Sequence, residues 1–491
     1  MNNSSKPRQI DIIKFAIMSV IGVFLFMVPL PHGDSFNIPL GIALNWLGGT
    51  INSVSVNGFG LLVLIACLMV TVSLLGTILA YVVKPAFIME NDGLKRLFLS
   101  SPVYFVSKVV AVIVAWLVFV DIGPDWLIGW DGGSLMLLEL IADNGGLIAI
   151  FLVVGLAIPI LTDFGLMEFL GILIRKVVRV LFTLPGRSSI DLFGSWFSSS
   201  AAGVIITRDQ HEKGFYTHRE AAAICVNFTL VSLPFTFVVA SRLELGGSFA
   251  LFYLVICVTA ILLAVVMPRI WPLRGMKDEY LPEVGKQIDE NVPEDVSTLS
   301  WAVNLAGNRA NKTGATQVIK SGLSNWLSIF MDLIPVILAW GTIALIIQNQ
   351  TEIFNWLSWP FARLLELLRV QEAATYAPAT IVGFIDMFVP AILLSSNFYL
   401  VSCEYAGYAL CEYFGTEGYE GCVRVLTAPL ETRFILGALS IVQIIYLAET
   451  GILILKSKIP LNIGHLIIIF LMRTVFALPI IVLLTRLLFN V

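Results

Sequence analysis

The sequence predicts an all-α polytopic membrane protein of inverted repeats, with re-entrant helical hairpins and broken transmembrane helices. The first observation is composition: of 491 residues, 58% are hydrophobic and 13% are charged, whereas a soluble domain has about 25% charged residues. The second is a motif that occurs twice, because Ile190-Asp191-Leu192-Phe193 and Ile385-Asp386-Met387-Phe388 each precede a small polar cluster. Polar groups in corresponding places of two apolar halves indicate a transporter binding site.

The first 145 residues predict a bundle of three transmembrane helices that serves as a scaffold or an oligomerisation unit. Apolar runs lie at 10–30, 57–83 and 102–121, each close to the length of about 20 residues that spans a bilayer. The first run follows two basic residues, as in a signal peptide, but no small-residue cleavage site follows it, so we interpret it as a retained span. Further clear spans are expected at 146–162, 221–241, 249–268, 326–348, 432–455 and 461–489.

The loops alternate in their lysine and arginine content, and this alternation predicts the orientation. Loops 31–56 and 122–145 contain neither residue type, whereas the N-terminus, loop 84–101 and residues 175–219 contain several. Cytoplasmic loops carry the excess of positive charge in membrane proteins. We therefore expect a multi-pass protein of the bacterial cytoplasmic (inner) membrane with its N-terminus in the cytoplasm.

Two related halves follow the N-terminal bundle. Residues 146–268 form the first repeat, 269–325 a polar cytoplasmic linker, and 326–491 the second repeat, which carries an insertion at 403–425. The linker has too few large apolar residues for a core. Each half has a proline-containing span, an amphipathic stretch, the motif, and a span that opens with charged residues. The first half begins with a span that runs inwards and the second with one that runs outwards, so the repeats are expected to be inverted.

The segments around the two motifs are expected to enter the membrane and return on the same side, as hairpins with polar clusters at their tips. Segment 188–207 follows the turn signal Pro185-Gly186 and is too short to cross twice. Irregular backbone at membrane depth is tolerated where protein buries it or water reaches it. We interpret the clusters as substrate-binding groups that line a cavity, and the alternative is small-residue helix packing. The residues are Ser198, Ser199, Ser200, Ser395, Ser396 and Asn397.

Further polar residues lie in the motifs and in the spans that follow the hairpins. Asn227 and Gln443 occupy these two spans and are expected to bind substrate. Glu449 is an isolated carboxylate in an apolar helix and a candidate ion-coupling group. Asp191 and Asp386 have two interpretations, coordination of a coupling ion or an N-terminal helix cap.

Several other classes of function find no support in the sequence. The formal net charge of −4 argues against a nucleic acid partner. Motifs of zinc proteases, serine hydrolases and phosphate-binding loops are absent, so we predict no enzymatic activity, no metal site and no cofactor other than Na⁺ as a coupling ion. Cys403, Cys411 and Cys422 lie in the insertion, and two of them are expected to pair if it faces an oxidising compartment.

Two stretches of the first half resemble a known superfamily. Thr162–Gly171 (TDFGLMEFLG) and Gly186–Ser195 (GRSSIDLFGS) are similar to the nucleoside-recognition (Gate) domain, most of all to its bacterial YjiH-type membrane proteins, and the resemblance extends over 146–455. Concentrative nucleoside transporters are more distant, and the acidic and amide side chains of their hairpin tips are replaced here by the serines 198–200. The resemblance implies hairpins, broken helices and, by analogy with related transporters, a homo-oligomer.

Together these observations predict a secondary active transporter of a small polar solute, coupled to Na⁺ or H⁺. An amino acid, a dipeptide and a nucleoside-like molecule all fit, and the binding site is expected between the two hairpin tips. The expected partners are this solute and the lipid bilayer. The alternative is a non-transporting membrane scaffold of the Gate-domain type. A scaffold has no need to hold polar residues at hairpin tips within the membrane, so those residues favour transport.

Overall fold

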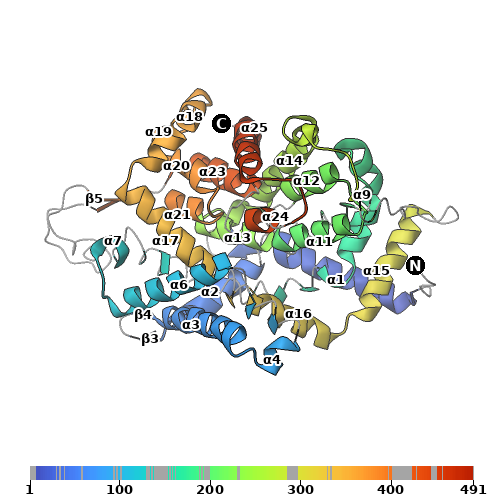
Figure 1. Ribbon diagram of the computed structural model, residues 1–491, viewed down its shortest axis with the longest axis horizontal. Coiled ribbons are helices and arrows are strands. Elements are labelled where there is room, and N and C mark those ends of the chain that lie inside the picture. The colour runs from blue at the N-terminus through green and yellow to red at the C-terminus, as the bar shows by residue number, and fades with distance from the viewer. Residues whose placement is uncertain are drawn as a thin grey trace.

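The described residues of the computed structural model consist mainly of helices, with short two-stranded hairpins between some of them (Figure 1). The structure describes residues 7–489 apart from the positions given at the end of this paragraph. These positions are 29, 33–34, 38, 57–58, 92–93, 96–97, 100–101, 129–132, 134–135, 138–152, 154–155, 158, 161, 187, 190–191, 193–199, 229–232, 283, 285–296, 329, 332–333, 396, 401–422, 427, 444–449 and 456.

The helices follow the expected order of segments. The N-terminal segment forms α1 (Gln9–Met27), α2 (Pro39–Asn52), α3 (Leu61–Val82), α4 (Ala86–Met89), α6 (Pro102–Val120) and α7 (Asp125–Ile128). The first half forms α9 (Leu166–Phe182), α11 (Ser200–Glu212), α12 (His218–Asn227), α13 (Leu233–Arg242) and α14 (Phe249–Val266). The linker forms α15 (Thr298–Lys312) and α16 (Ala315–Ser328). The second half forms α17 (Ile334–Gln350), α18 (Ile353–Leu367), α19 (Ala373–Tyr376), α20 (Pro378–Val382), α21 (Val389–Ser395), α23 (Leu430–Val442), α24 (Ile452–Leu455) and α25 (Ile463–Phe489).

The strands pair antiparallel between neighbours in the chain. β1 (Leu30–His32) pairs with β2 (Ser35–Asn37), and β3 (Ser55–Val56) pairs with β4 (Phe59–Gly60). β5 (Asn397–Leu400) pairs with β6 (Val423–Leu426), in a register that places Asn397 opposite Leu426. The last pair encloses the expected insertion, most of which lies outside the described residues.

Four described helices are long and apolar enough to cross a membrane, within Gln9–Phe26, Leu61–Val82, Gly246–Arg269 and Ile463–Leu488. They confirm four of the expected spans, and the protein is therefore a multi-pass membrane protein. The expected spans 221–241 and 432–455 are instead interrupted, because α12 ends at Asn227 and α23 at Val442. An apolar run shows that a segment is buried in lipid or protein, but it does not show where its helix stops.

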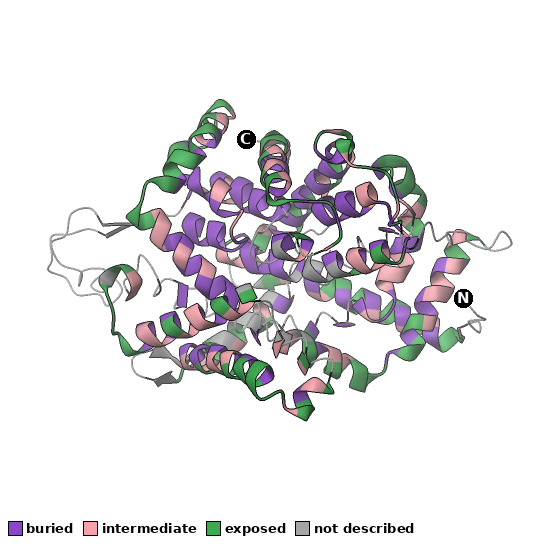
Figure 2. Cartoon of the chain, in the orientation of Figure 1, coloured by how far each residue is buried: buried purple, intermediate pink, exposed green. Residues whose placement is uncertain are grey.

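A sharp bend follows the first span of the second half. Helices α17 and α18 are separated by a short break and bent by 83°. The side chains of Trp356, Trp359 and Leu367 on α18 are exposed, as the green colour of this helix in Figure 2 shows. An amphipathic helix that leaves a span at a steep angle, with exposed tryptophans, suits the membrane–water interface. The inverted relationship of the two halves stays a prediction.

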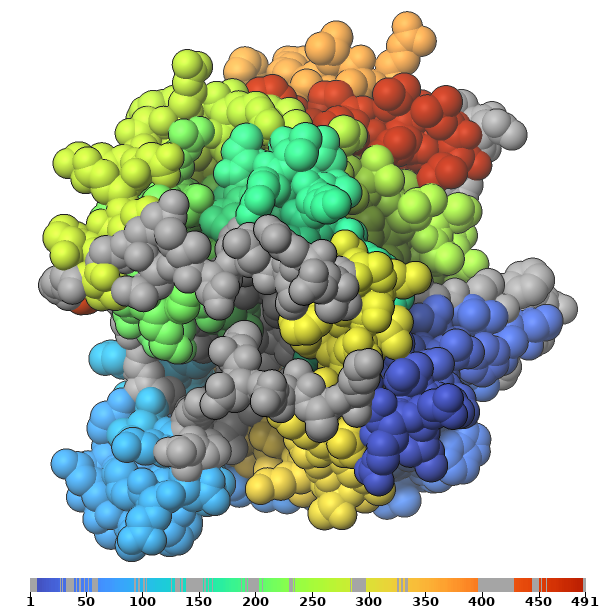
Figure 3. All heavy atoms as spheres, turned by 90° about the vertical axis from the view of Figure 1, so that its right-hand side faces the viewer, coloured from blue at the N-terminus to red at the C-terminus, as the bar shows by residue number. Residues whose placement is uncertain are grey.

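The expected linker contains a helix that packs between two earlier parts of the chain. α15 lies against α1 and against α9, and Figure 3 shows it in yellow beside the dark blue of α1 and the teal of α9. Its contact face is made of small residues, since Ala302, Ala306 and Ala310 are fully buried. This packing differs from the expected coreless segment, because small side chains permit close helix contact without large apolar residues.

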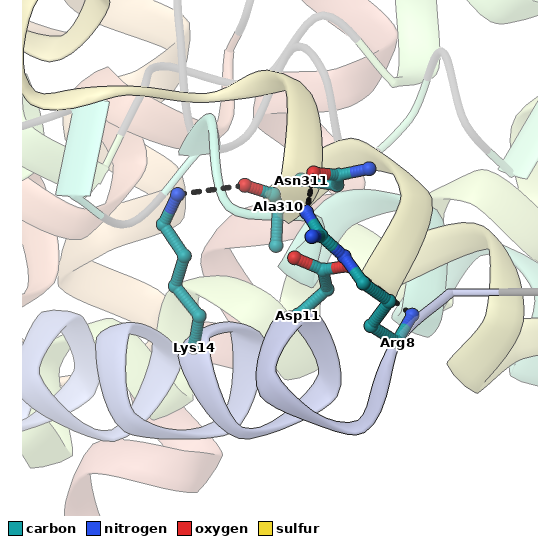
Figure 4. Close-up of polar contacts among 5 residues, drawn as sticks. All are labelled: Arg8, Asp11, Lys14, Ala310 and Asn311. Carbon is teal, nitrogen blue, oxygen red and sulfur yellow. Dashed lines mark hydrogen bonds and ion pairs between the residues drawn. The ribbon is translucent and has the colours of Figure 1, made fainter.

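Polar contacts fix the C-terminal end of α15 to α1 (Figure 4). Lys14 Nζ donates hydrogen bonds to the carbonyl oxygens of Ala310, at 3.0 Å, and Thr313. Arg8 Nη2 donates to Asn311 Oδ1 at 3.3 Å, while Arg8 Nε pairs with Asp11 at 3.4 Å. A lysine that donates to the last carbonyl groups of a helix interacts favourably with the negative end of the helix dipole.

Candidate functional site at the junction of two broken helices

The first broken helix begins at a strong cap and ends in the protein interior. Thr217 Oγ1 accepts a hydrogen bond from Glu220 N at 3.2 Å, and Glu220 Oε2 accepts one from Thr217 N at 2.8 Å. This reciprocal capping box satisfies two donors at the start of α12. All residues from Ala221 to Asn227 are buried. The helix therefore ends inside the protein, and its last carbonyl groups need partners there.

The second broken helix has the same design. Every residue of α23 from Phe434 to Val442 is buried, and Gln443 is the capping residue after its last turn. The chain is next described at Thr450 and Gly451, which are π-helical and lead into α24 at Ile452. Figure 2 shows α12, α13 and α23 as the mainly buried centre of the molecule, with exposed residues on the outer helices. Two helix ends, one from each half, are thus located in the apolar interior.

Arg473 joins these two helix ends. It lies in α25 and its side chain is fully buried. Its Nη1 donates hydrogen bonds to Val226 O at 2.9 Å and to Asn227 Oδ1 at 2.8 Å. Its Nε and Nη2 both donate to Val442 O, at 3.1 and 2.7 Å. One guanidinium group therefore caps the C-terminal ends of α12 and α23 together. Carbonyl groups at a helix C-terminus carry partial negative charge, so they stabilise a buried cation.

Gln443 belongs to the same polar centre. Its Nε2 donates to Thr474 Oγ1 and to Thr380 O, both at 2.9 Å. Thr474 is the neighbour of Arg473 on α25, and Thr380 lies in the short helix α20. The Oε1 atom of Gln443 is buried and has no hydrogen-bond partner among the described residues. A Cβ atom added at Gly383 would lie 2.4 Å from this oxygen, so the turn after α20 approaches the amide closely.

The structure brings together two of the expected substrate-binding residues. Asn227 and Gln443 both contact consecutive residues of α25, and both are buried. Asn227 also donates from Nδ2 to Ala223 O at 2.9 Å. Their binding role stays a prediction, while their common location is now established by the fold. We call the set of Asn227, Val442, Gln443, Arg473 and Thr474 the junction.

Asp386 lies in the turn that leads into the short helix α21. Its Oδ1 accepts hydrogen bonds from Phe388 N at 2.7 Å and Val389 N at 3.3 Å, and α21 begins at Val389. This is the arrangement of an N-terminal cap, one of the two interpretations that the sequence left open. The cap explains why an aspartate stands at this position, and an ion-coupling role of Asp386 stays a prediction.

Ser395 and Asn397 of the second-half polar cluster lie among the described residues. The turn between the helices α20 and α21 contains Asp386, whereas Ser395 is the last residue of α21. Ser395 Oγ donates to Ile392 O at 3.2 Å within its own helix. Asn397 begins β5, and Ser200 begins α11. In the second half, the motif residue Asp386 lies in the turn before α21, and Ser395 lies at the end of that helix. The remaining expected positions, Ser198, Ser199, Ser396, Asp191 and Glu449, lie outside the described residues, as do Cys403, Cys411 and Cys422.

Arg473 is the functional candidate that the sequence reasoning missed. A signal was present, because it is a charged residue in the apolar run 461–489. Ionisable residues within a transmembrane segment are expensive and mark functional positions. The comparison of the two halves did not reveal Arg473, since α14, the last helix of the first half, contains no charged residue.

A histidine pair lies outside the apolar segments, near the start of α12. The rings of His211 and His218 are 4.9 Å apart. His211 is fully buried, its Nδ1 donates to Tyr216 O at 3.0 Å, and its Nε2 has no partner among the described residues. Burial lowers the pKa of His211, the nearby His218 and Lys458 lower it further, and the hydrogen bond to Tyr216 opposes the change. Among the described residues, no three metal-ligating side chains come together.

Comparison with known proteins gives the family context of this arrangement. The Gate family, described as nucleoside recognition, matches residues 146–246, a range that includes Asn227 and the first broken helix. The chain is also 41% identical over 480 residues to an uncharacterized protein of Alkalihalophilus pseudofirmus, a match that covers 97% of this chain and 95% of the relative. No solved structure shows a significant match. The Gate resemblance is therefore confirmed, and the YjiH-type assignment stays an expectation. The chain belongs to the same family as the Alkalihalophilus pseudofirmus protein and carries a Gate domain at residues 146–246.

Proposed function

We propose that this Gate-domain membrane protein is a secondary active transporter of a small polar solute, coupled to Na⁺ or H⁺. The observation that carries the proposal is the junction, where a helix of each half ends in the buried centre of a protein that is otherwise strongly apolar. Discontinuous helices with polar groups at their ends form the binding sites of many secondary transporters. A protein that only anchored partners would gain nothing from these buried helix ends.

Gln443 is the proposed contact between the junction and the solute. Its buried Oε1 has no partner among the described residues, and a buried acceptor without a hydrogen bond costs about 1–3 kcal/mol. An N–H or O–H group of a bound solute would recover this free energy. Amino acids, dipeptides and nucleoside-like molecules all offer such donors, so these solutes remain the proposed substrate class.

Two further sets of residues complete the proposed site. The serine clusters at 198–200 and 395–396, together with Asn397, are proposed to line the solute cavity with Asn227. The carboxylates of Asp191, Asp386 and Glu449 are proposed to couple an ion to the movement. We propose that the protein resides in the bacterial inner membrane, with its N-terminus in the cytoplasm. The distribution of positive charge supports this orientation.

Uptake into proteoliposomes tests the proposal. The purified protein is reconstituted and offered a pooled panel of labelled amino acids, dipeptides and nucleosides, with a Na⁺ gradient, a proton gradient or neither. We expect gradient-dependent uptake of at least one solute class above that of protein-free liposomes. Gln443→Leu should lower this uptake about tenfold, because a lost hydrogen bond of about 1.4 kcal/mol corresponds to a factor of ten.

The matched control is Gln350→Leu, at the exposed end of α17, which should leave uptake unchanged. Folded wild-type protein that moves no solute under either gradient would contradict transport and favour the membrane scaffold. Equal losses in both glutamine variants would remove Gln443 from the proposed site.

A further inference from the structure

We propose that Arg473 is a built-in cation that occupies the position of a metal-ion site at the junction, so that the two broken helices are held together without a bound Na⁺ there. This inference rests on the transport function proposed above in one respect, since it locates the coupling ion elsewhere. The geometry itself is independent of what the protein transports.

The oxygen atoms around the guanidinium group form a set that suits a cation. Val226 O, Asn227 Oδ1 and Val442 O all lie within 3.1 Å of its nitrogen atoms. Two of these oxygens are carbonyl groups at helix ends, and the third is a side-chain amide. In transporters with discontinuous helices, carbonyl oxygens of this kind coordinate the coupling cation. Here the positive charge is attached covalently to α25.

Two helix dipoles reinforce this arrangement. α12 and α23 end at Asn227 and Val442, and each helix C-terminus carries about half a negative charge. The ends of the two helices converge on one guanidinium, so their partial charges together approach one unit. A buried cation is costly unless such groups compensate it. The two helix ends therefore compensate the buried charge of Arg473, and Arg473 in turn provides the positive charge at this position.

The hydrogen bonds of Arg473 indicate that it positions the two helix ends and does not serve as a receptor for an anionic solute. An arginine has five N–H groups, and four of them donate to Val226, Asn227 and Val442. Most of the donor capacity is thus committed to the two helix ends. An arginine that captured a carboxylate would present two parallel donors to the cavity. Arg473 is consequently assigned as a positioning residue.

Lysine is not expected to replace this side chain fully. The planar guanidinium contacts both helix ends at once because its nitrogen atoms are spread over a rigid fork. A lysine ammonium keeps the charge but concentrates its donors at one point. Arg473→Lys should therefore remain folded with reduced thermal stability, while Arg473→Ala leaves both helix ends without a cation.

The test is chemical rescue of the purified full-length protein in detergent. Thermal midpoints are measured for wild type, Arg473→Ala and Arg473→Lys with millimolar guanidinium chloride, NaCl or choline chloride at equal ionic strength. The control is Arg486→Ala, because Arg486 lies on the same helix but pairs with Glu431 at 3.0 Å in a partly exposed position. Guanidinium at these concentrations is too dilute to denature, so its effect reports on binding.

We expect guanidinium to raise the midpoint of Arg473→Ala relative to choline, and to leave wild type and Arg486→Ala unchanged. Na⁺ should also stabilise Arg473→Ala more than it stabilises wild type, because the vacated oxygen set can accept a small cation. Folded Arg473→Ala that responds to neither cation would overturn the proposal.

If Arg473→Ala does not fold, Arg473→Lys still tests whether the side-chain charge at position 473 replaces a bound cation. It should show the same difference between Na⁺ and choline as wild type, since its charge still fills the site. A larger Na⁺ response in Arg473→Lys than in wild type would overturn the built-in cation. These readouts need no uptake measurement, so they separate a failure of this inference from a failure of the proposed transport.

Discussion

Arg473 and Asn227 are 246 residues apart in the chain, and a 2.8 Å hydrogen bond joins them in the buried centre of the protein. Asn227 lies within the range that matches the Gate family, whereas Arg473 lies in the last helix, far outside that range. The bond therefore ties the Gate domain to the C-terminal helix. Since Arg473 also contacts Val442, a displacement of any one of these three segments strains the hydrogen bonds of the others.

Removal of the amide at this contact should destabilise the protein. Asn227→Ala leaves the buried guanidinium with one acceptor fewer, and a hydrogen bond to a charged group contributes about 1.5–3 kcal/mol. We expect a clear fall in the thermal midpoint of the purified protein. Asn311→Ala is the control, because Asn311 accepts from Arg8 at 3.3 Å at an exposed position. Equal thermal midpoints for the two variants would contradict a stabilising role of the hydrogen bond between Asn227 and Arg473.

Gly165 should tolerate no side chain. It is the residue before α9, and the backbone of α15 passes close to it. Its φ of +99° is unfavourable for other residues, and an added Cβ would lie 2.5 Å from Ala306 O. Gly165→Ala should therefore lower stability by more than the roughly 1–2 kcal/mol of the left-handed backbone alone, and reduce the yield of folded protein. Gly314→Ala, which has open space around it, is the comparison, and size-exclusion profiles of both variants report the outcome.

The buried histidine makes stability depend on pH. Burial lowers the pKa of His211 below its ordinary value of 6.5, so the unfolded chain binds more protons than the folded protein below this pH. The contribution to stability is fully present above pH 6.5 and is lost as the pH falls below it. Thermal midpoints measured from pH 8 to pH 5 should fall less for His211→Gln than for wild type. His465→Gln, at the start of α25, should retain the wild-type slope, and a retained slope in His211→Gln would exclude this source.

Two substitutions at Asp386 separate its two interpretations. Asp386→Ala removes the cap of α21 and should cost about 1 kcal/mol of stability, whereas Asp386→Asn keeps an oxygen that can accept both hydrogen bonds. If the carboxylate also couples an ion, as we propose, Asp386→Asn should change the Na⁺ or H⁺ dependence of uptake at unchanged stability. Uptake by Asp386→Asn with wild-type ion dependence would leave the cap as its whole role.

The expected orientation can be tested with fusion reporters. A reporter inserted at position 290, in the linker, should read as cytoplasmic, and one at position 412, in the insertion, should read as external. The reason is that the two positions are separated by an odd number of crossings if the halves are inverted. Both reporters on one side of the membrane would rule out the inverted arrangement. A reporter at the N-terminus, expected in the cytoplasm, serves as the reference.

The sequence by itself determined the membrane class and several spans, and it singled out two residues that the structure places at the junction. Apolar runs gave α1, α3, α14 and α25 because hydropathy is a local property that every residue of a span expresses. Asn227 and Gln443 were identified for a similar reason, since a polar residue in an apolar run is conspicuous wherever the chain later places it.

Only the tertiary structure decided how these elements meet. The breaks after Asn227 and Val442 come to one point because α25 crosses both helix ends, and a contact over hundreds of residues has no local signature. The structure places Asp386 in the turn before α21 and Ser395 at the end of that helix. Hydropathy does not specify these positions, because the exact start of a helix depends on its hydrogen bonds. The reason for the small residues on α15 is likewise visible only in the structure. At Gly165 the two backbones approach so closely that larger side chains are excluded.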